Sequence, residues 1–268
     1  TNADVRDRLG ELYERTKKWA DLADLLSSNA DIIASAHGDV LQAMPAPPAA
    51  PAGRSSNPPG PSMIPPPPPH VAEQVKLLRR AAQIHLEERK APADAVPVLE
   101  RVTNLVPHDR ELLLLLCDAY TASQRERDAA SVLERIIASF GNKRTKELSL
   151  YHHRLGRALA TLGQKDVALT QLDMAFKIDP GSVEVLRDLG VLALEANDLE
   201  RAQKTFRALL LQRLDGQSGI SKGEVFYYLG EISMKQGDKA KAVQMLERAV
   251  ENDPNLDRAR SMLSGLKN

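Results

Sequence analysis

The chain has little of several residue types, and each shortage excludes a class of protein or site. Its 268 residues include one cysteine, Cys117, which excludes an internal disulfide and a multi-cysteine zinc site and fits a reducing compartment. Aromatic residues make up only 4% of the chain, whereas 43% of it is hydrophobic. A core built mainly from alanine and leucine favours closely packed helices over sheets.

An excess of either charge is also missing. Lysine plus arginine and aspartate plus glutamate each number 36, so the net charge gives no general attraction to nucleic acid or to an anionic membrane. The longest leucine run, residues 112–116, is about a quarter of the ~20 residues that a membrane-spanning helix needs. We therefore expect neither a nucleic acid partner nor a membrane span.

The sequence predicts the compartment only in general terms. The chain begins at Thr1 rather than at Met, which we interpret as a processed product or a piece of a longer protein. The low cysteine content favours a cytoplasmic location. A periplasmic location would follow if a signal peptide had been removed.

Catalytic and metal-binding motifs are scarce. His152 and His153 are adjacent, so on a helix they point about 100° apart and cannot easily share one metal ion. Residues 215–224 are glycine-rich but lack the spacing of a phosphate-binding loop, and we interpret them as a loop insertion. Cys117 is predicted to pack in the core. The sequence thus predicts no catalytic residue, no metal, no cofactor and no enzyme activity; turnover would need a domain outside this segment.

Proline is concentrated in one stretch, residues 37–70, which includes five consecutive prolines at 65–69. Proline blocks helix formation and removes backbone donors, and little in this stretch can be buried. The sequence therefore predicts a disordered or polyproline linker. The linker has two interpretations: it is a simple spacer, or it docks on an aromatic groove of a separate module.

The rest of the chain has hydrophobic residues at helical spacing. Residues 1–36 are predicted to form a helical hairpin, divided by the polar residues 16–18. From residue 71 onward, helices alternate with short polar turns and with longer turns, which is the pattern of stacked hairpins.

A Leu-Gly pair recurs in successive segments of this helical region. Gly156 and Gly190 are 34 residues apart, and Gly190 and Gly230 are 40 apart, which is 34 plus a six-residue insertion. This spacing resembles the tetratricopeptide repeat, a 34-residue unit of two helices. The positions that carry the resemblance in residues 149–182 are Leu155, Gly156, Leu159, Ala168, Leu172, Ala175 and Pro180, with His152 where the family often has tryptophan.

The other units match the repeat to different degrees. Residues 1–36 are degenerate, and Cys117 occupies the glycine position of a looser unit. The predicted units lie near 76–109, 110–143, 149–182, 183–216 and 223–256.

The resemblance implies an all-α fold, a right-handed α-solenoid of about six antiparallel helical hairpins. The tetratricopeptide solenoid would occupy residues 71–256, and residues 257–268 would form a C-terminal capping helix that closes the exposed end. Small residues such as Gly156 and Ala168 would let two helix backbones approach closely.

The resemblance also implies a partner-binding groove, which in this family is lined by the first helix of each unit. The middle of this groove is basic and its ends are apolar or aromatic, so we expect a protein or peptide partner with an acidic centre and apolar flanks. The alternative is that these are ordinary solvated helix positions. The predicted groove residues are Leu114, Leu115, Asp118, His153, Arg154, Arg157, Arg187, Asp188, Val191, Tyr227, Tyr228 and Glu231.

The leucine run 112–116 has two interpretations, because five consecutive leucines make a helix apolar all round. Either a neighbouring hairpin or residues 37–70 cover the extra face, or the run forms a hydrophobic docking groove centred on Leu114 and Leu115.

A non-catalytic scaffold or adaptor is the function that these features favour. The abundance of alanine, arginine and proline resembles the large tetratricopeptide scaffolds of high-GC bacteria, which serve motility, secretion, envelope assembly and signalling. One alternative is a helical-repeat RNA-binding protein, against which the balanced charge argues. Another is a regulatory domain of a larger enzyme. The sequence names neither the partner nor the oligomeric state.

Overall fold

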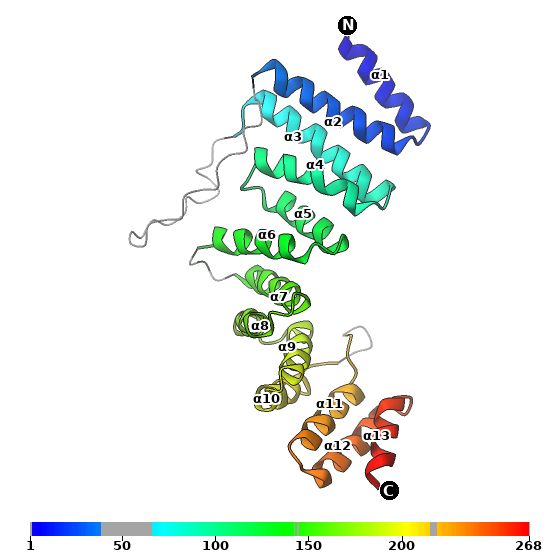
Figure 1. The fold of residues 1–268 in the computed structure, drawn as a ribbon, viewed down its shortest axis with the longest axis vertical. Helices are drawn as coiled ribbons and strands as arrows, with labels where there is room; N and C mark the ends of the chain where they lie inside the picture. Colours follow the sequence, from blue (N-terminus) through cyan, green and yellow to red (C-terminus); the bar gives the residue numbers. More distant parts are fainter. Residues whose placement is uncertain (1, 39–65, 142, 144, 215–218, 268) are drawn as a thin grey trace. The chain divides into compact units, whose positions relative to one another are not determined.

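The computed structural model describes residues 2–38, 66–141, 143, 145–214 and 219–267. In these ranges the chain forms thirteen α-helices, one π-helical turn and no β-strand (Figure 1). The all-α class predicted from the sequence is therefore confirmed. The helices group into two compact units, residues Thr1–Asn142 and Lys143–Asn268.

The first unit is a series of helices in which each packs against the next. Because α2 contacts α3 and α3 contacts α4, residues 1–36 stack on the helices that follow the proline-rich stretch. A π-helical turn, Ile84–Glu88, extends α3. The helices are α1 (Asn2–Arg15), α2 (Trp19–Ala36), α3 (Pro69–Gln83), α4 (Pro92–Leu105), α5 (Arg110–Ala122) and α6 (Glu126–Ser139).

Most of the predicted linker, residues 39–65, lies outside the described residues. At its end, α3 begins at Pro69, two residues before the predicted start of the solenoid. Proline is tolerated in the first turn of a helix because its missing N–H would have no partner there. The last of the five consecutive prolines therefore begins a helix.

The second unit contains three helical hairpins and a final helix. Side-chain oxygens cap three of its helices, since Ser182, Asp198 and Asp238 each accept a hydrogen bond from the first turn of the helix that follows. Ser221 and Glu224 form a capping box at the start of another. The helices are α7 (Lys146–Thr161), α8 (Lys165–Ile178), α9 (Val183–Glu195), α10 (Leu199–Leu209), α11 (Lys222–Lys235), α12 (Lys239–Asn252) and α13 (Asp257–Lys267).

Glycine allows the two helices of each hairpin in the second unit to approach closely. A Cβ atom on Gly156 would lie 2.8 Å from Cγ of Leu172 and 3.2 Å from the backbone oxygen of Ala168. The same contact recurs where Gly190 meets Phe206 and where Gly230 meets Leu246. Sterics therefore explain why the Leu-Gly pair recurs along the sequence.

The last helix covers the end of the final hairpin. Ala259 of α13 is buried against Leu246 and Ala249 of α12, and Met262, Leu263 and Leu266 are partly buried around them. The opposite side of α13 carries polar residues that are exposed to solvent. Helix α13 is therefore amphipathic, with its apolar side packed on α12.

We predict that Gly156→Ala lowers the free energy of unfolding by about 1–3 kcal/mol, the usual cost of adding a methyl group to a closely packed contact. Urea unfolding followed by circular dichroism measures the change. The matched control is Gly265→Ala in α13, where a Cβ would meet nothing within 4 Å. At that position the free energy of unfolding should rise by up to about 1 kcal/mol, because alanine loses less backbone entropy on folding than glycine. Equal effects at the two positions would contradict the steric explanation.

Candidate functional site

The predicted groove residues lie on four first helices. Three of them, Leu114, Leu115 and Asp118, belong to α5 in the first unit, and the other nine belong to α7, α9 and α11 in the second. They occupy the same positions relative to the Leu-Gly pair of α7, α9 and α11, and relative to Leu116-Cys117 in α5, so they project from a common side of each helix. We call this side of α7, α9 and α11 the first-helix face.

Asp188 is the centre of the charged residues on this face. His153 of α7 donates a hydrogen bond from Nε2 to Oδ2 of Asp188 over 2.8 Å, and Arg187 donates from Nε to Oδ1 over 2.8 Å. Nε of Arg157 lies 3.7 Å from the same Oδ2. The structure thus brings together four of the residues that the sequence predicted as a binding site, from two helices that are adjacent in the stack.

The carboxyl group of Asp188 is ionised at neutral pH. Burial acts to raise its pKa, but the hydrogen bonds from His153 and Arg187 outweigh the burial and hold the pKa below its usual value. Because an ionised carboxylate only accepts hydrogen bonds, Nε2 of His153 must carry a hydrogen. The two arginines together carry more charge than the single carboxylate can neutralise, so the cluster keeps an excess of positive charge.

The predicted loop insertion touches this cluster. Gly219 has a backbone φ of +68°, and a Cβ there would lie 2.5 Å from Nη1 of Arg187. Ile220, the next residue, is buried, which fixes this end of the loop. Residues 215–218 lie outside the described residues. The described end of the insertion therefore borders the Arg187 side of the first-helix face, a contact that no sequence pattern indicated.

Tyr227 and Tyr228 are half-buried and take part in packing. The ring of Tyr228 stacks on Phe206 at a centroid distance of 4.8 Å, and Tyr227 meets Tyr228 edge to face at 5.5 Å. The guanidinium of Arg258, from α13, lies 4.6 Å from the Tyr227 ring centroid and 5.3 Å from that of Tyr228. Burial and the negative charge of Glu231 raise the pKa of Tyr227. The two tyrosines thus help to hold α13 in place.

The leucine run in α5 divides between core and partly exposed positions. Leu112, Leu113 and Leu116 are buried, whereas Leu114 and Leu115 are half-buried and Asp118 is exposed. The two interpretations of the run therefore apply to different leucines, and only Leu114 and Leu115 remain candidates for a docking surface.

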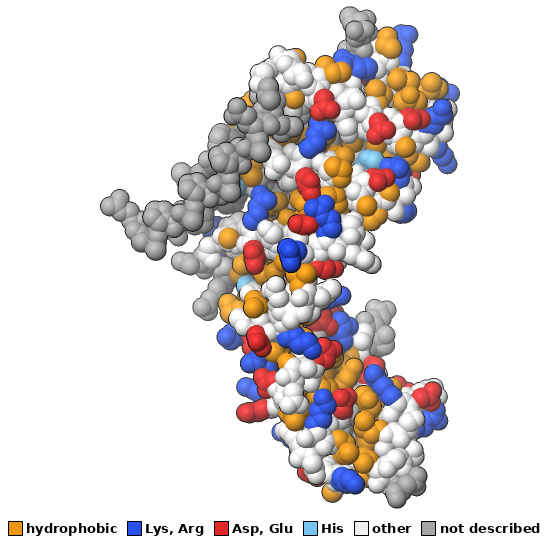
Figure 2. All heavy atoms as spheres, viewed as in Figure 1, with side chains coloured by type: hydrophobic (Ala, Val, Ile, Leu, Met, Phe, Trp, Pro, Cys, Tyr) orange, Lys and Arg blue, Asp and Glu red, His pale blue; other side chains and the backbone are white. Residues whose placement is uncertain are grey.

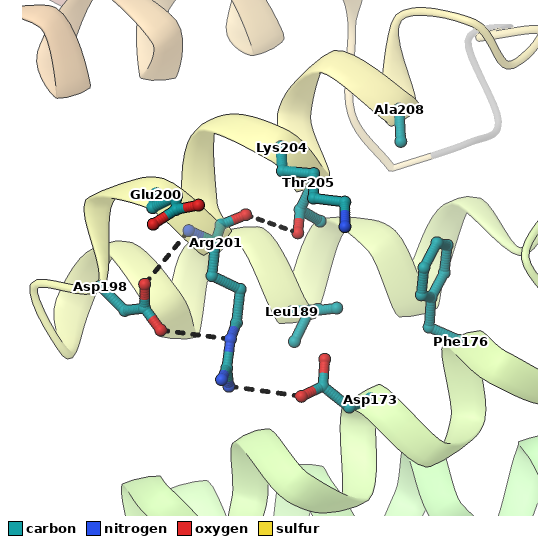
Figure 3. A pocket seen from close by; sticks show the side chains of 9 residues that line it. All are labelled: Asp173, Phe176, Leu189, Asp198, Glu200, Arg201, Lys204, Thr205 and Ala208. Atoms are coloured by element: carbon teal, nitrogen blue, oxygen red, sulfur yellow. Dashed lines mark hydrogen bonds and ion pairs between the residues drawn. The ribbon is translucent and has the colours of Figure 1, made fainter.

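A hollow that the sequence did not predict lies between the second helices α8 and α10 (Figure 3). Its volume is about 360 Å³, and its apolar lining comes from Phe176, Leu189 and Ala208. Arg201 spans the gap, with Nη1 3.4 Å from Asp173 of α8 and Nε 3.2 Å from Asp198. Residues of α8, α9 and α10 line it together, so no spacing along one helix could have indicated it.

The described residues offer no cluster that would bind a metal ion. No three His, Cys, Asp or Glu side chains gather closely enough in this part of the chain. Within the same residues, no helix is both long enough and apolar enough to cross a membrane. In the space-filling view, acidic and basic side chains are interspersed along the visible surface (Figure 2).

We predict that part of the acid sensitivity of the fold comes from Asp188. Since its pKa is lower in the folded chain than in the unfolded chain, it stabilises the fold above the unfolded pKa, and this stabilisation is lost as the pH falls toward the folded pKa. Asp188→Asn should therefore lose less stability than the unsubstituted chain below about pH 5. Urea unfolding at a series of pH values measures this loss of stability. Asp166→Asn, at an exposed position of α8, is the control. If the free energy of unfolding changed with pH in the same way for Asp188→Asn and for the unsubstituted chain, the stabilising role of ionised Asp188 would be contradicted.

Comparison with known proteins identifies the family. Models of the tetratricopeptide repeat match residues 86–148, 153–219 and 187–257, which together make up more than half of the chain. No curated protein matches the chain.

Several solved structures share the fold. YrrB, described as a TPR protein with an unusual peptide-binding site, has a TM-score of 0.56 and 18% identity over 69% of this chain and 90% of its own. MamA from Desulfovibrio magneticus RS-1 has a TM-score of 0.55 and 18% identity over 68% and 97%. The C-terminal part of a TPR repeat-containing protein from Cytophaga hutchinsonii has a TM-score of 0.55 and 16% identity over 70% and 69%.

At these identities the structural similarity concerns the fold, whereas the repeat models match the sequence itself. The chain belongs to the tetratricopeptide repeat family.

Proposed function

We propose that this chain is a non-catalytic scaffold that binds an acidic peptide or protein segment on the first-helix face of residues 143–268. The tetratricopeptide fold serves protein–protein interaction in general, and its members are generally not enzymes. YrrB, which shares the fold, is described as having a peptide-binding site. Both facts support a protein or peptide as the partner of this chain.

The cluster around Asp188 is the observation that carries the proposal. Arg157 and Arg187 converge on one carboxylate, so a second carboxylate, supplied by the partner, would find cations already held in place. Arg157 is exposed and Arg154 is half-buried, which makes both accessible to a partner. Arginine binds carboxylates through two parallel hydrogen bonds, and these would fix the position of an acidic segment along the face.

Half-buried apolar side chains continue the same face. Val191 follows Asp188 along α9, and Tyr228 of α11 is half-buried and stacks on Phe206. Apolar side chains that flank the acidic centre of the partner would pack on them and supply most of the binding energy. The partner is thus an acidic segment with at least one apolar flank.

The wider setting of the scaffold follows from composition. Richness in alanine, arginine and proline supports a place in a larger bacterial assembly for motility, secretion, the envelope or signalling. Such an assembly would lie in the cytoplasm, or in the periplasm if the chain is exported. The proline-rich stretch would join the scaffold as a spacer or as a ligand of a separate module.

Defined peptides test the groove. We predict that peptides with a Glu- or Asp-rich centre and Leu or Phe flanks bind with affinities that fall as salt rises, and that peptides with lysine in place of the acids do not bind. Arg154→Glu combined with Arg187→Glu should weaken binding at least about tenfold, because it replaces two attractive charges by two repulsive ones. Fluorescence anisotropy measures the affinities.

The matched control reverses two cations on a second helix, Lys204→Glu with Arg207→Glu, both exposed on α10. This variant has the same net charge as the first but leaves the first-helix face unchanged. Equal weakening by the two variants would show that only net charge matters and would refute the site. Salt-sensitive binding of single-stranded RNA in place of acidic peptides would favour the RNA-binding alternative.

A further inference from the structure

Arg157 and Arg187 face Asp188 with their Nε atoms, which leaves the ends of both guanidinium groups for other contacts. Nε of Arg187 lies 2.8 Å from Oδ1 of Asp188, and Nε of Arg157 lies 3.7 Å from Oδ2. No hydrogen bond with another described residue uses an Nη atom of either arginine. Both residues therefore keep the N–H donors of their Nη atoms for a partner.

Arg79 in the first unit shows the opposite case. Its two Nη atoms lie 2.9 Å from Asp109 and 2.7 Å from Glu111, so acids of the fold itself occupy them. Arg157 and Arg187 instead share one acid, Asp188, between them. Arg79 thus uses its whole fork within the fold, whereas the packing of the helices leaves the terminal donors of the other two arginines without a role.

The two guanidinium groups are accessible and already held in place. The side chains of Arg157 and Arg187 are 66% and 29% exposed, and that of Asp188 is 19% exposed. His153 also donates a hydrogen bond to Asp188, which fixes the carboxylate from the neighbouring helix. A Cβ on Gly219 would lie 2.5 Å from Nη1 of Arg187, so the missing side chain there gives this guanidinium its space. A partner would therefore meet donors that are ordered before it binds.

The charge and the donors of this cluster fit a phosphate better than a carboxylate. Two guanidinium groups around one ionised carboxylate keep a net positive charge. A carboxylate of a partner has two oxygens, which the fork of one arginine occupies in parallel hydrogen bonds. A phosphate on serine or threonine carries a charge of about −1.5 to −2 at pH 7 and has three strong acceptor oxygens. It can therefore accept hydrogen bonds from both arginines at once.

We propose that the acidic centre of the partner is a phosphorylated serine or threonine, whose phosphate accepts hydrogen bonds from the Nη atoms of both Arg157 and Arg187. Asp188 is then a positioning residue, because it holds the two guanidinium groups beside each other without contacting the partner. Clusters of arginine bind phosphorylated segments of proteins by such contacts. This inference rests on the proposed function, since it names the ligand of the same face.

A phosphate of RNA is the less favoured source of this group. Binding to an RNA backbone needs cations spread along a groove, whereas Arg157 and Arg187 converge on one carboxylate. Half-buried Val191 lies about one turn beyond Asp188 on α9, where it would pack on an apolar side chain that flanks the phosphorylated residue. The geometry thus fits a single phosphate within a protein segment.

Three peptides of one sequence test the proposal, with Leu and Phe flanks and with phosphoserine, glutamate or serine at the centre. The phosphoserine peptide should bind the whole chain at least about tenfold more tightly than the glutamate peptide, because the phosphate adds charge and a third acceptor oxygen. The serine peptide should bind most weakly. Fluorescence anisotropy at one salt concentration measures the three affinities.

Variants that conserve charge locate the phosphate. Arg157→Lys with Arg187→Lys keeps both positive charges but replaces each planar fork by a single ammonium group. The preference for phosphoserine over glutamate should fall below about threefold, while the glutamate peptide itself loses less than about threefold in affinity. The matched control, Arg135→Lys with Arg207→Lys, changes exposed arginines of the second helices α6 and α10 and should keep the full preference. Circular dichroism checks that each variant is folded.

The outcomes separate this inference from the proposed function. Equal affinities for the phosphoserine and glutamate peptides would overturn the phosphate as ligand but leave the acidic groove, whereas no binding of any peptide would overturn both. A preference for phosphoserine that survives in the double lysine variant would also overturn the assignment to Arg157 and Arg187. If inorganic phosphate alone or single-stranded RNA bound as tightly as the phosphoserine peptide, a phosphorylated protein segment would be refuted as the partner.

Discussion

The close approach of two helices at a glycine is the constraint on which the second unit depends. Gly156, Gly190 and Gly230 each meet a large apolar side chain of the partner helix at a distance that a side chain of their own would not allow. Since this contact fixes how each hairpin closes, it also fixes which sides of the first helix remain for other tasks. In α9 and α11 the side opposite the glycine meets the preceding hairpin, and one side between these two contacts belongs to the first-helix face.

Sequence spacing could predict the hairpins because each depends on contacts that recur every 34 residues. The all-α class, the repeat family and the positions of the Leu-Gly pairs follow from such local periodicity. Even the degenerate N-terminal segment keeps helical spacing, and α1 and α2 are helices. The sequence also grouped His153, Arg157, Arg187 and Asp188 on corresponding positions, and the structure brings these four together.

Other features depend on contacts that have no period. The π-helical turn at Ile84–Glu88 comes with a buried His85 whose Nδ1 lies 2.6 Å from Nη1 of Arg89, and no spacing signals such a pair. Arg258 of α13 lies over the rings of Tyr227 and Tyr228. Residues that the repeat pattern predicts to be available to a partner are therefore partly occupied by packing. The hollow beside Arg201 forms where three helices fail to fill the space between them, which depends on side-chain sizes at distant positions.

The six-residue insertion between α10 and α11 has an evolutionary consequence. Its described end places Gly219 against Arg187, while the contacts that stack the hairpins lie elsewhere. Loops tolerate substitutions, insertions and deletions far better than packed helices do. Changes in this loop can therefore alter the border of the charged face without any change in the residues that hold the hairpins together. Related chains with the same repeats could in this way diverge in partner while they keep one architecture.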